Sequence, residues 1–253
     1  MATSMGKFLK KLSFFLYTRF PFANAVTLLM LLGERATREN YPFLPPRVIF
    51  INVGLFIVVG VCLSSNLKRK EACLIYCGQL LYMGYSIWSV PAVRYREWVR
   101  VRMLIRIIGT VGVYTLLAFI SSARNSSNEL RRLGETVTGV YLLCYAYSIM
   151  NIPEETEAFK DHVLYGDLMI YVVVGALAIG ALTCLSGRYI VDVCYLIVLV
   201  LLFLTLSIET DTRYWRRRGL DFWNQIRMIF DNVTVIVGFL FIGLSGKVKP
   251  QMV

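Results

Sequence analysis

The sequence predicts an all-α polytopic membrane protein with eight transmembrane helices, arranged as two parallel four-helix repeats. Composition is the first reason: apolar residues make up 57% of the 253 residues and charged residues 17%, against about 25% charge in a soluble domain. The second is that the apolar residues form long runs, and about 20 helical residues cross the roughly 30 Å hydrocarbon core of a bilayer. The third is that the two halves share an ordered set of residues. A soluble enzyme and a disulfide-stapled secreted module are therefore excluded.

The apolar runs set the expected helices. The first run contains Arg19 and Pro21 and the fifth is short, so seven spans would follow if the first run lay in the membrane interface. Lys7, Lys10 and Lys11 imitate the start of a signal peptide, but Arg19 and Pro21 interrupt the apolar core that such a peptide needs. We therefore expect the first run to be retained as a helix. The eight runs are 14–33, 48–65, 72–90, 103–120, 137–152, 168–185, 191–208 and 226–244.

The internal repeat rests on residues that recur in the same order. Trp98 matches Trp223 and Arg102 matches Arg227, both at an offset of 125, and further matches lie at an offset of 121. Because four is an even number, both copies would cross the bilayer in the same direction, about a pseudo-twofold axis along the membrane normal. The predicted organisation is a basic tail over 1–13, a first repeat over 14–122, a linker over 123–136, a second repeat over 137–246 and a tail over 247–253.

Two charged residues are predicted near the middle of the bilayer. Arg106 and Asp231 each lie eight residues beyond a tryptophan, Trp98 and Trp223, which places them about 12 Å further in. Each charge alone would cost about 2.5–3.5 kcal/mol on insertion scales. Since the repeat puts them at equivalent positions, we expect an intramembrane charge pair. The pair could fix the two halves together, or it could line a polar cavity for a lipid headgroup, an anion or a proton.

Five further residues are predicted to contact lipid headgroups or a partner protein. Trp98 and Trp223 suit the membrane interface, and Arg102 and Arg227, one turn further in, are long enough to reach back to headgroups. Asn224 beside Trp223 adds an amide that could bind a headgroup or a partner. The sequence thus predicts a binding surface at the start of the fourth and eighth helices.

Catalytic, metal and cofactor sites are not expected. One histidine, His162, cannot supply both a triad base and a metal cluster. The cysteines all lie in or beside apolar runs, where they are typical packing residues. They are Cys62, Cys73, Cys77, Cys144, Cys184 and Cys194. The protein is therefore not expected to be an enzyme.

The net charge of +11 is explained by basic loops at anionic headgroups, so no nucleic-acid partner is expected. Lysine and arginine are balanced across the two sides, and only the acidic loop over 154–167 favours an outside position. We therefore expect both termini inside. The sequence does not distinguish the plasma membrane from the endoplasmic reticulum.

Most of the chain resembles the transmembrane protein 101 family of animal multi-pass proteins. The segments that carry the resemblance are Tyr17–Phe22, Glu34–Ala36, Val101–Met103, Leu168–Ile170, Leu185–Gly187, Tyr214–Trp215 and Asp221–Gln225. The resemblance implies eight spans and a loose link to activation of NF-kappa-B signalling, without a catalytic residue. A weaker, fold-level similarity reaches the DoxX-like four-helix membrane proteins, whose functions are diverse.

Three functions follow as hypotheses. The first is a non-enzymatic accessory subunit, assembly factor or signalling adaptor, with the lipid bilayer and another membrane protein as partners. The second is a binder or carrier of a lipid or small anion, centred on Arg106 and Asp231. The third, a membrane enzyme such as a quinone-linked redox subunit, has no metal or nucleophile site to support it.

Overall fold

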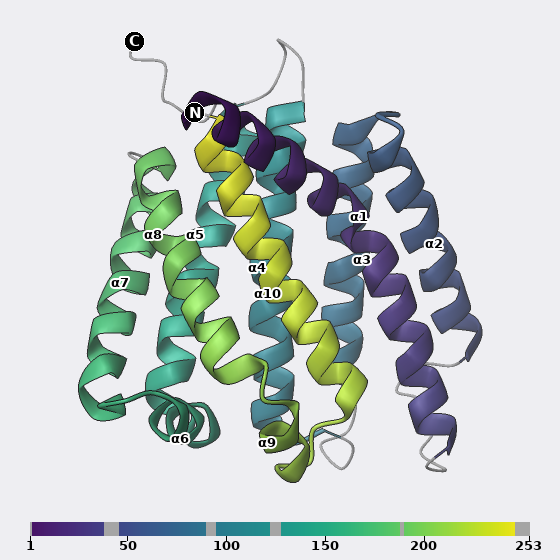
Figure 1. The fold of residues 1–253 in the computed structure, drawn as a ribbon. Helices are drawn as coiled ribbons and strands as arrows, with labels where there is room; N and C mark the ends of the chain where they lie inside the picture. The colour runs from purple at the N-terminus through teal and green to yellow at the C-terminus, as the bar shows by residue number, and fades with distance from the viewer. Residues whose placement is uncertain (1, 38–45, 90–94, 122–127, 188–189, 246–253) are drawn as a thin grey trace.

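The chain folds into a bundle of helices. The structure, a computed structural model, describes residues 2–37, 46–89, 95–121, 128–187 and 190–245, and these residues contain helices and no strand (Figure 1). The elements are α1 (Ala2–Thr37), α2 (Pro46–Ser64), α3 (Arg69–Ser89), α4 (Glu97–Ser121), α5 (Asn128–Asn151), α6 (Pro153–His162), α7 (Gly166–Ser186), α8 (Ile190–Leu204), the π-helix η1 (Thr205–Glu209), α9 (Thr212–Arg217) and α10 (Phe222–Ser245).

Eight long helices lie side by side, and the short helices α6 and α9 sit together at one end of the bundle (Figure 1). At the opposite end α1 begins and α10 ends. Each of the eight predicted apolar runs falls on one of the long helices, with α8 continuing into η1. The placement of both termini inside the cell stays a prediction.

Helices α4 and α10 form the centre. They pack against each other, α4 also packs against α3 and α5, and α10 also packs against α1 and α8. Helix α2 lies outside α1 and α3, and α7 lies outside α5 and α8. Burial follows this order: of the most apolar 18 residues, 78% are buried in α4 and 67% in α10, against 39% in α2 and 33% in α7. The outer helices therefore present apolar faces to the lipid.

Five helices are long and apolar enough to cross a membrane: α1, α2, α4, α7 and α10. Helices α3 and α5 are also long, 21 and 24 residues, but they are less apolar. The apolar part of α8 and η1, Val193–Glu209, is shorter than a usual span. The chain is thus an integral membrane protein with five candidate spans among its described residues.

Helix α1 extends beyond its predicted range. Most of the expected N-terminal tail is helical, and α1 changes direction part-way along, crossing the end of α10 before it runs down the bundle (Figure 1). Pro21 inside the helix accounts for a bend, because proline removes a backbone hydrogen bond and its ring crowds the preceding turn. Phe14 then packs on Phe241 with ring centroids 5.5 Å apart, and Tyr17 stacks on Tyr114 at 4.3 Å.

The predicted linker over 123–136 is also partly helical, because α5 begins at Asn128. Two predicted segments lie wholly or partly outside the described residues: residues 123–127 of the linker and the C-terminal tail over 247–253.

Candidate functional site

Helix α4 carries two buried arginines on one face. Arg102 and Arg106 are four residues apart, which places them one above the other on a helix. Their side chains are 0% and 1% exposed, so neither reaches water or a headgroup directly. The carboxylates that meet them come from elsewhere in the chain: Glu209 ends η1, and Glu155 lies in the first turn of α6.

Glu209 bridges the two arginines. One carboxylate oxygen accepts a hydrogen bond from Arg102 Nη2, and the other accepts one from Arg106 Nη2. Gln225 of α10 donates to the same carboxylate at 3.1 Å and to the backbone carbonyl of Glu209 at 2.6 Å. One carboxylate therefore joins α4, η1 and α10.

Glu155 and Trp215 complete the surroundings of Arg102. Its Nε lies 2.9 Å from Glu155 Oε1, and its guanidinium carbon lies 3.4 Å from the centroid of the Trp215 ring. A desolvated cation over an indole face is attracted by about 2 kcal/mol or more. The Trp215 indole donates in turn to the Ile208 carbonyl at 2.9 Å.

We call Arg102, Arg106, Glu155, Glu209 and Gln225 the guanidinium cluster. It holds two guanidiniums and two carboxylates, so its formal charges cancel. Buried ions are costly unless they are paired and hydrogen-bonded, and here each carboxylate meets at least one guanidinium. The arrangement neutralises itself without a ligand.

The π-helix η1 explains how Glu209 reaches the cluster. A π-turn adds one residue to a helical turn and thereby rotates the residues that follow. The end of η1 is also capped from outside, because Trp215 and Gln225 donate to the carbonyls of Ile208 and Glu209. Unpaired carbonyls at a helix end would otherwise be costly in this buried position.

A second set of charges lies on α10. Asp231 is 3% exposed and makes a side-chain hydrogen bond with Asn24 of α1, whose amide also donates to the Tyr76 hydroxyl at 2.6 Å. Arg227, one turn away, is 6% exposed, and its Nη2 has no hydrogen-bond partner within the described part of the chain. We call Arg227, Asp231, Asn24 and Tyr76 the α10 cluster.

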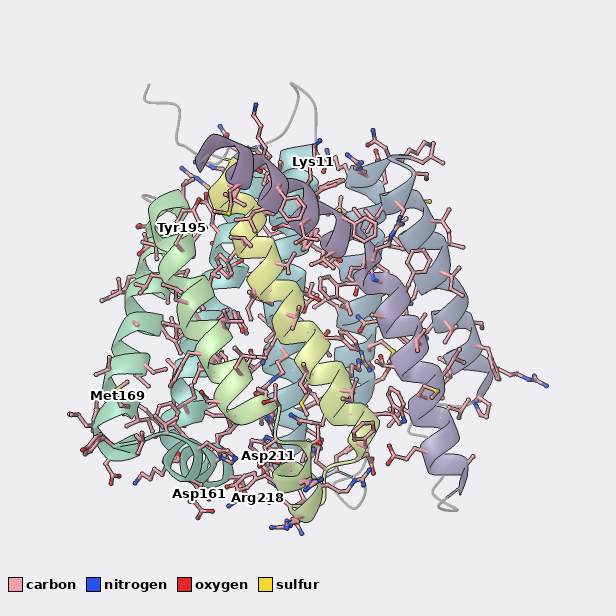
Figure 2. The ribbon with its side chains drawn as sticks, viewed as in Figure 1. Lys11, Asp161, Met169, Tyr195, Asp211 and Arg218 are labelled. Carbon is pink, nitrogen blue, oxygen red and sulfur yellow. The ribbon has the colours of Figure 1, made fainter. Side chains whose placement is uncertain are left out.

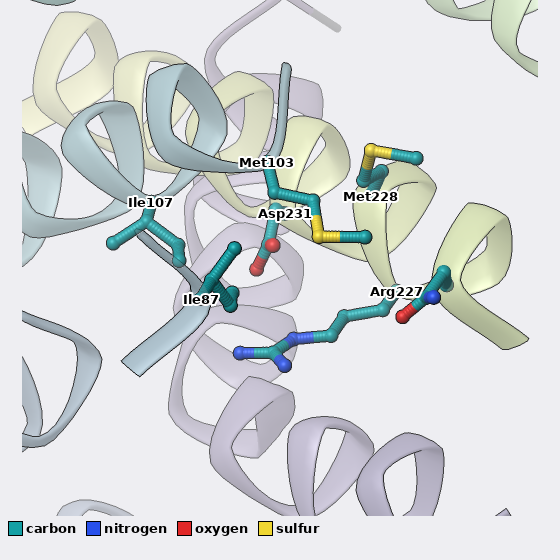
Figure 3. A pocket seen from close by; sticks show the side chains of 7 residues that line it. Ile87, Met103, Ile107, Arg227, Met228 and Asp231 are labelled. Atoms are coloured by element: carbon teal, nitrogen blue, oxygen red, sulfur yellow. The ribbon is translucent and has the colours of Figure 1, made fainter. Parts of the chain in front are cut away.

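The α10 cluster borders a small cavity. Its volume is about 10 Å³, which suffices for one water molecule at most. In Figure 3 the Arg227 guanidinium and the Asp231 carboxylate extend toward the same space, beside Ile87 and Met103. The remaining lining residues are Ile107, Asn224 and Met228.

The predicted charge pair is corrected by this geometry. Arg106 and Asp231 are both buried on the two central helices, as expected, but Arg106 forms its ion pair with Glu209. No ion pair between Arg106 and Asp231 occurs within 4.0 Å. The reason is the rotation of the helices: Arg106 faces η1, whereas Asp231 faces Asn24 of α1.

The predicted contact residues lie mostly inside the molecule. Trp98 is 8% exposed and packs on Trp215 with ring centroids 5.9 Å apart, and Arg102 is held in the guanidinium cluster. Asn224 is buried and donates to the Tyr95 hydroxyl and to Asp221, both at 3.2 Å. Arg227 is buried too, so of the five only Trp223 is half-exposed. Four of them therefore expose little surface to a headgroup in this conformation, and contact with a headgroup or partner stays a prediction.

Sequence reasoning missed Glu209 and Glu155. Glu209 lies one residue past the predicted run 191–208, and Glu155 belongs to the segment expected as an acidic outside loop. The available signal was charge balance: two arginines on one face of a central helix require two carboxylates. The sequence contains several candidates and does not choose among them.

Helices α6 and α9 meet through polar contacts at the end of the bundle, where Figure 2 shows Asp161, Asp211 and Arg218 close together. Tyr214 donates to Asp161 at 3.0 Å, and His162 Nε2 lies 3.3 Å from Asp211. Hydrogen bonds from the Tyr214 backbone N–H and from His162 hold the pKa of Asp211 below its usual range. Burial, followed by the hydrogen bond to Asp161, raises the pKa of Tyr214 to about 12.

Metal-ligating and thiol groups do not gather in the described residues. No three histidine, cysteine, aspartate or glutamate side chains there lie close enough to hold a metal ion. All six cysteines are free thiols. Cys77 contacts the Val111 carbonyl at 3.6 Å and the Thr115 hydroxyl at 3.7 Å, which makes it a packing residue between α3 and α4.

Comparison with known protein families shows to which family the chain belongs. The profile of the TMEM101 protein family matches residues 3–245, nearly the whole length. The chain belongs to the TMEM101 family. No solved structure matches it. The resemblance to this family seen in the sequence is thereby confirmed, while the fold-level similarity to DoxX-like proteins stays a prediction.

Proposed function

We propose that this TMEM101-family protein is a non-enzymatic accessory, assembly or adaptor subunit of a membrane complex. The observation that carries the proposal is the guanidinium cluster: the two arginines of α4 are neutralised by Glu155 and Glu209. A site for a charged substrate needs a net charge left available for it, and in this cluster the two carboxylates balance the two arginines. The cluster instead ties α4, α6, η1 and α10 into one rigid body.

The proposal includes an eight-span architecture of two four-helix repeats. Its support is a matching set of helix contacts: α1–α2, α2–α3 and α3–α4 in the first half correspond to α5–α7, α7–α8 and α8–α10 in the second. The contacts between the halves also correspond, because α4 packs on α5 as α10 packs on α1. Helices α4 and α10 then flank the pseudo-twofold axis.

A pair of glutamates supports the same repeat. Glu34 lies 121 residues before Glu155, the offset at which other residues recur. Glu155 meets Arg102 at the start of α4, and Glu34 accepts a hydrogen bond from the Trp223 backbone N–H at the start of α10, at 3.2 Å. Each half thus places a carboxylate near the start of the central helix of the other half: Glu34 from the end of α1, and Glu155 from α6, which directly follows α5.

The outer helices offer the surfaces for a partner. Helix α7 exposes a run of large apolar side chains, and α6 and α9 expose charges at one end of the bundle. The exposed apolar residues of α7 include Leu168, Tyr171, Val172, Ile179 and Leu182. The NF-kappa-B link implied by the family would then act through bound membrane proteins.

Mild-detergent purification of the tagged protein from its native membrane, followed by mass spectrometry, tests the proposal. We expect a stoichiometric membrane-protein partner. A matched pair of variants locates it: Leu182→Arg on α7 should release the partner, whereas Val58→Arg on the exposed face of α2 should keep it. A partnerless protein that binds or moves a solute would contradict the proposal.

A second candidate function is a carrier of a lipid headgroup, small anion or proton at the repeat interface. One observation favours it: Arg227 has a buried nitrogen without a partner at the edge of a cavity. The cavity of about 10 Å³ is too small for a headgroup, so this candidate requires a proton or a water-sized ion in this conformation. Solute flux lost in Arg227→Leu, with the fold retained, would favour it over the accessory subunit.

A further inference from the structure

An apolar groove runs along the outside of the bundle between α1 and α10. Its volume is about 420 Å³, and its walls are Phe22 and Val26 of α1 facing Phe222, Trp223, Ile226 and Phe230 of α10. From Phe222 to Phe230 the helix rises about 12 Å, which is close to the depth of one leaflet of a 30 Å hydrocarbon core. The groove has the length and chemistry of a site for an acyl chain.

One end of the groove is basic. Helix α9 precedes α10 and carries Arg213, Arg216 and Arg217, all exposed and without an ion pair among the described residues. The guanidinium carbon of Arg216 lies 5.4 Å from the centroid of the Phe222 ring, and Phe222 lines the groove. A positive charge therefore stands where the apolar groove opens toward the headgroup layer. Two acidic side chains lie near this end: Glu34 accepts a hydrogen bond from the Trp223 backbone N–H, and Asp221, which precedes Phe222, accepts one from the Asn224 amide.

We propose that this groove binds one anionic glycerophospholipid of the bilayer, with its phosphate at Arg216 and an acyl chain between α1 and α10. A polybasic segment attracts an anionic headgroup by about 1 kcal/mol per arginine, or roughly fivefold in affinity. A partner helix fits less well, because helix interfaces in membranes are enriched in small residues and hydrogen-bonding side chains. Large aromatic and aliphatic side chains line this groove instead.

The corresponding groove beside α4 argues for the same assignment. Its walls include Glu97, Trp98 and Val101, each 125 residues before a residue of the first groove, and its volume is about 370 Å³. Pro153 and Glu154 at the start of α6 form part of its wall. Glu97 and Glu154 are among its lining residues, whereas no carboxylate lines the groove on the α10 side, so the phosphate site is assigned to the α10 side.

The fluorescence of Trp223, which lines the groove, can test the proposal. The other tryptophans are Trp98 and Trp215, which are buried, and Trp88, which is 52% exposed and is removed by Trp88→Phe. The Trp88→Phe protein is placed in phosphatidylcholine nanodiscs containing a small, equal fraction of either brominated phosphatidylglycerol or brominated phosphatidylcholine. We expect the anionic lipid to quench the fluorescence at several-fold lower mole fraction. Arg216→Gln, which removes one positive charge, should lower this preference about fivefold, and Arg216→Glu, which reverses the charge, should lower it further.

Two controls keep the result specific. Arg213→Glu makes the same charge change on α9 at a side chain without a ring contact to Phe222, and should reduce the preference less than Arg216→Glu. Ala23→Phe fills the groove from α1 and should reduce quenching by both lipids. If Arg216→Glu does not fold, Arg216→Gln replaces it in the comparison. Equal quenching by the two lipids, or equal effects of Arg216→Glu and Arg213→Glu, would overturn the proposal. Quenching by neither lipid would also overturn it, since the groove would then be covered by protein.

Discussion

The central helices α4 and α10 carry charges at equivalent positions, 125 residues apart, yet the two sets differ in chemistry. On α4 both charges are basic, and Glu155 and Glu209 reach them from other elements. On α10 the two charges are Arg227 and Asp231, one turn apart, with amide and hydroxyl groups of α1 and α3 nearby. The guanidinium cluster contains three ion-pair contacts between its arginines and carboxylates, whereas among the described residues the α10 cluster has no ion pair within 4.0 Å and borders a small cavity. Both clusters keep guanidinium nitrogens without a hydrogen-bond partner.

Under the proposed repeat, the position of buried charge recurs in both halves, but its partners do not. In the guanidinium cluster the pairing is distant in sequence and joins four elements, so it fixes the fold. In the α10 cluster the two charged residues, Arg227 and Asp231, lie on a single helix, and the cluster joins fewer elements. We therefore expect substitutions in the first cluster to cost more stability than the equivalent substitutions in the second.

The largest effect is expected for Glu209→Gln. The substitution removes the carboxylate shared by Arg102 and Arg106, so that only Arg102 keeps an ion pair, with Glu155. Breaking a buried ion pair by removing one partner costs about 3–5 kcal/mol. The yield of folded protein and its melting temperature in detergent should fall sharply. Glu157→Gln, whose carboxylate is 61% exposed and pairs with Arg218, is the control and should change little. A Glu209→Gln protein as stable as this control would remove the distinction between the clusters.

Substituting a glycine by alanine tests how closely α4 approaches α5. A Cβ on Gly112 would lie 2.5 Å from Thr138 Oγ1 and 3.0 Å from the Thr138 backbone nitrogen, so Gly112→Ala should cost about 1–3 kcal/mol. The position 125 residues later is Val237, which shows that α10 needs no glycine there. Gly54→Ala on α2 meets nothing within 4 Å and should be neutral. Thermal unfolding of the two alanine variants measures the difference, and equal melting temperatures would contradict it.

A smaller effect is expected for Arg227→Leu. Arg227 forms no ion pair within 4.0 Å in the described residues, so its removal leaves no tightly bound carboxylate without its partner. We expect a loss of stability below that of Glu209→Gln, measured under the same detergent conditions. A larger loss in Arg227→Leu would reverse the ranking of the two clusters.

The smallest effect concerns the contact of α6 with α9. A tyrosine whose pKa is raised in the folded state stabilises the fold below its ordinary pKa, and this contribution is lost as the pH rises through the raised value. The pKa of Tyr214 is about 12, so a slight loss of stability should begin above its ordinary value of 10.0. The difference in tyrosinate absorbance between the wild-type protein and Tyr214→Phe should titrate near the raised value. A titration at the ordinary value would show that Tyr214 is neither buried at this contact nor hydrogen-bonded to Asp161.

Much of the fold could be predicted because apolar runs and helical spacing are local signals. The eight long helices, the burial of Arg106 and Asp231 and their places on the central helices follow from such patterns. The partners of Arg106 could not be predicted, since Glu209 lies 103 residues away and its direction depends on a π-turn. The bend of α1 over α10 likewise depends on tertiary packing around Pro21.

The central claim is that the charges of the guanidinium cluster neutralise one another as a structural unit. A double-mutant cycle on Arg106 and Glu209 tests it most directly. Either Arg106→Leu or Glu209→Leu alone leaves a net buried charge, whereas the double variant leaves Arg102 with Glu155, which is neutral. We predict that the double variant is more stable than Glu209→Leu alone and retains its membrane-protein partner. Additive losses of stability, or loss of a bound solute in every variant with the fold intact, would contradict the account.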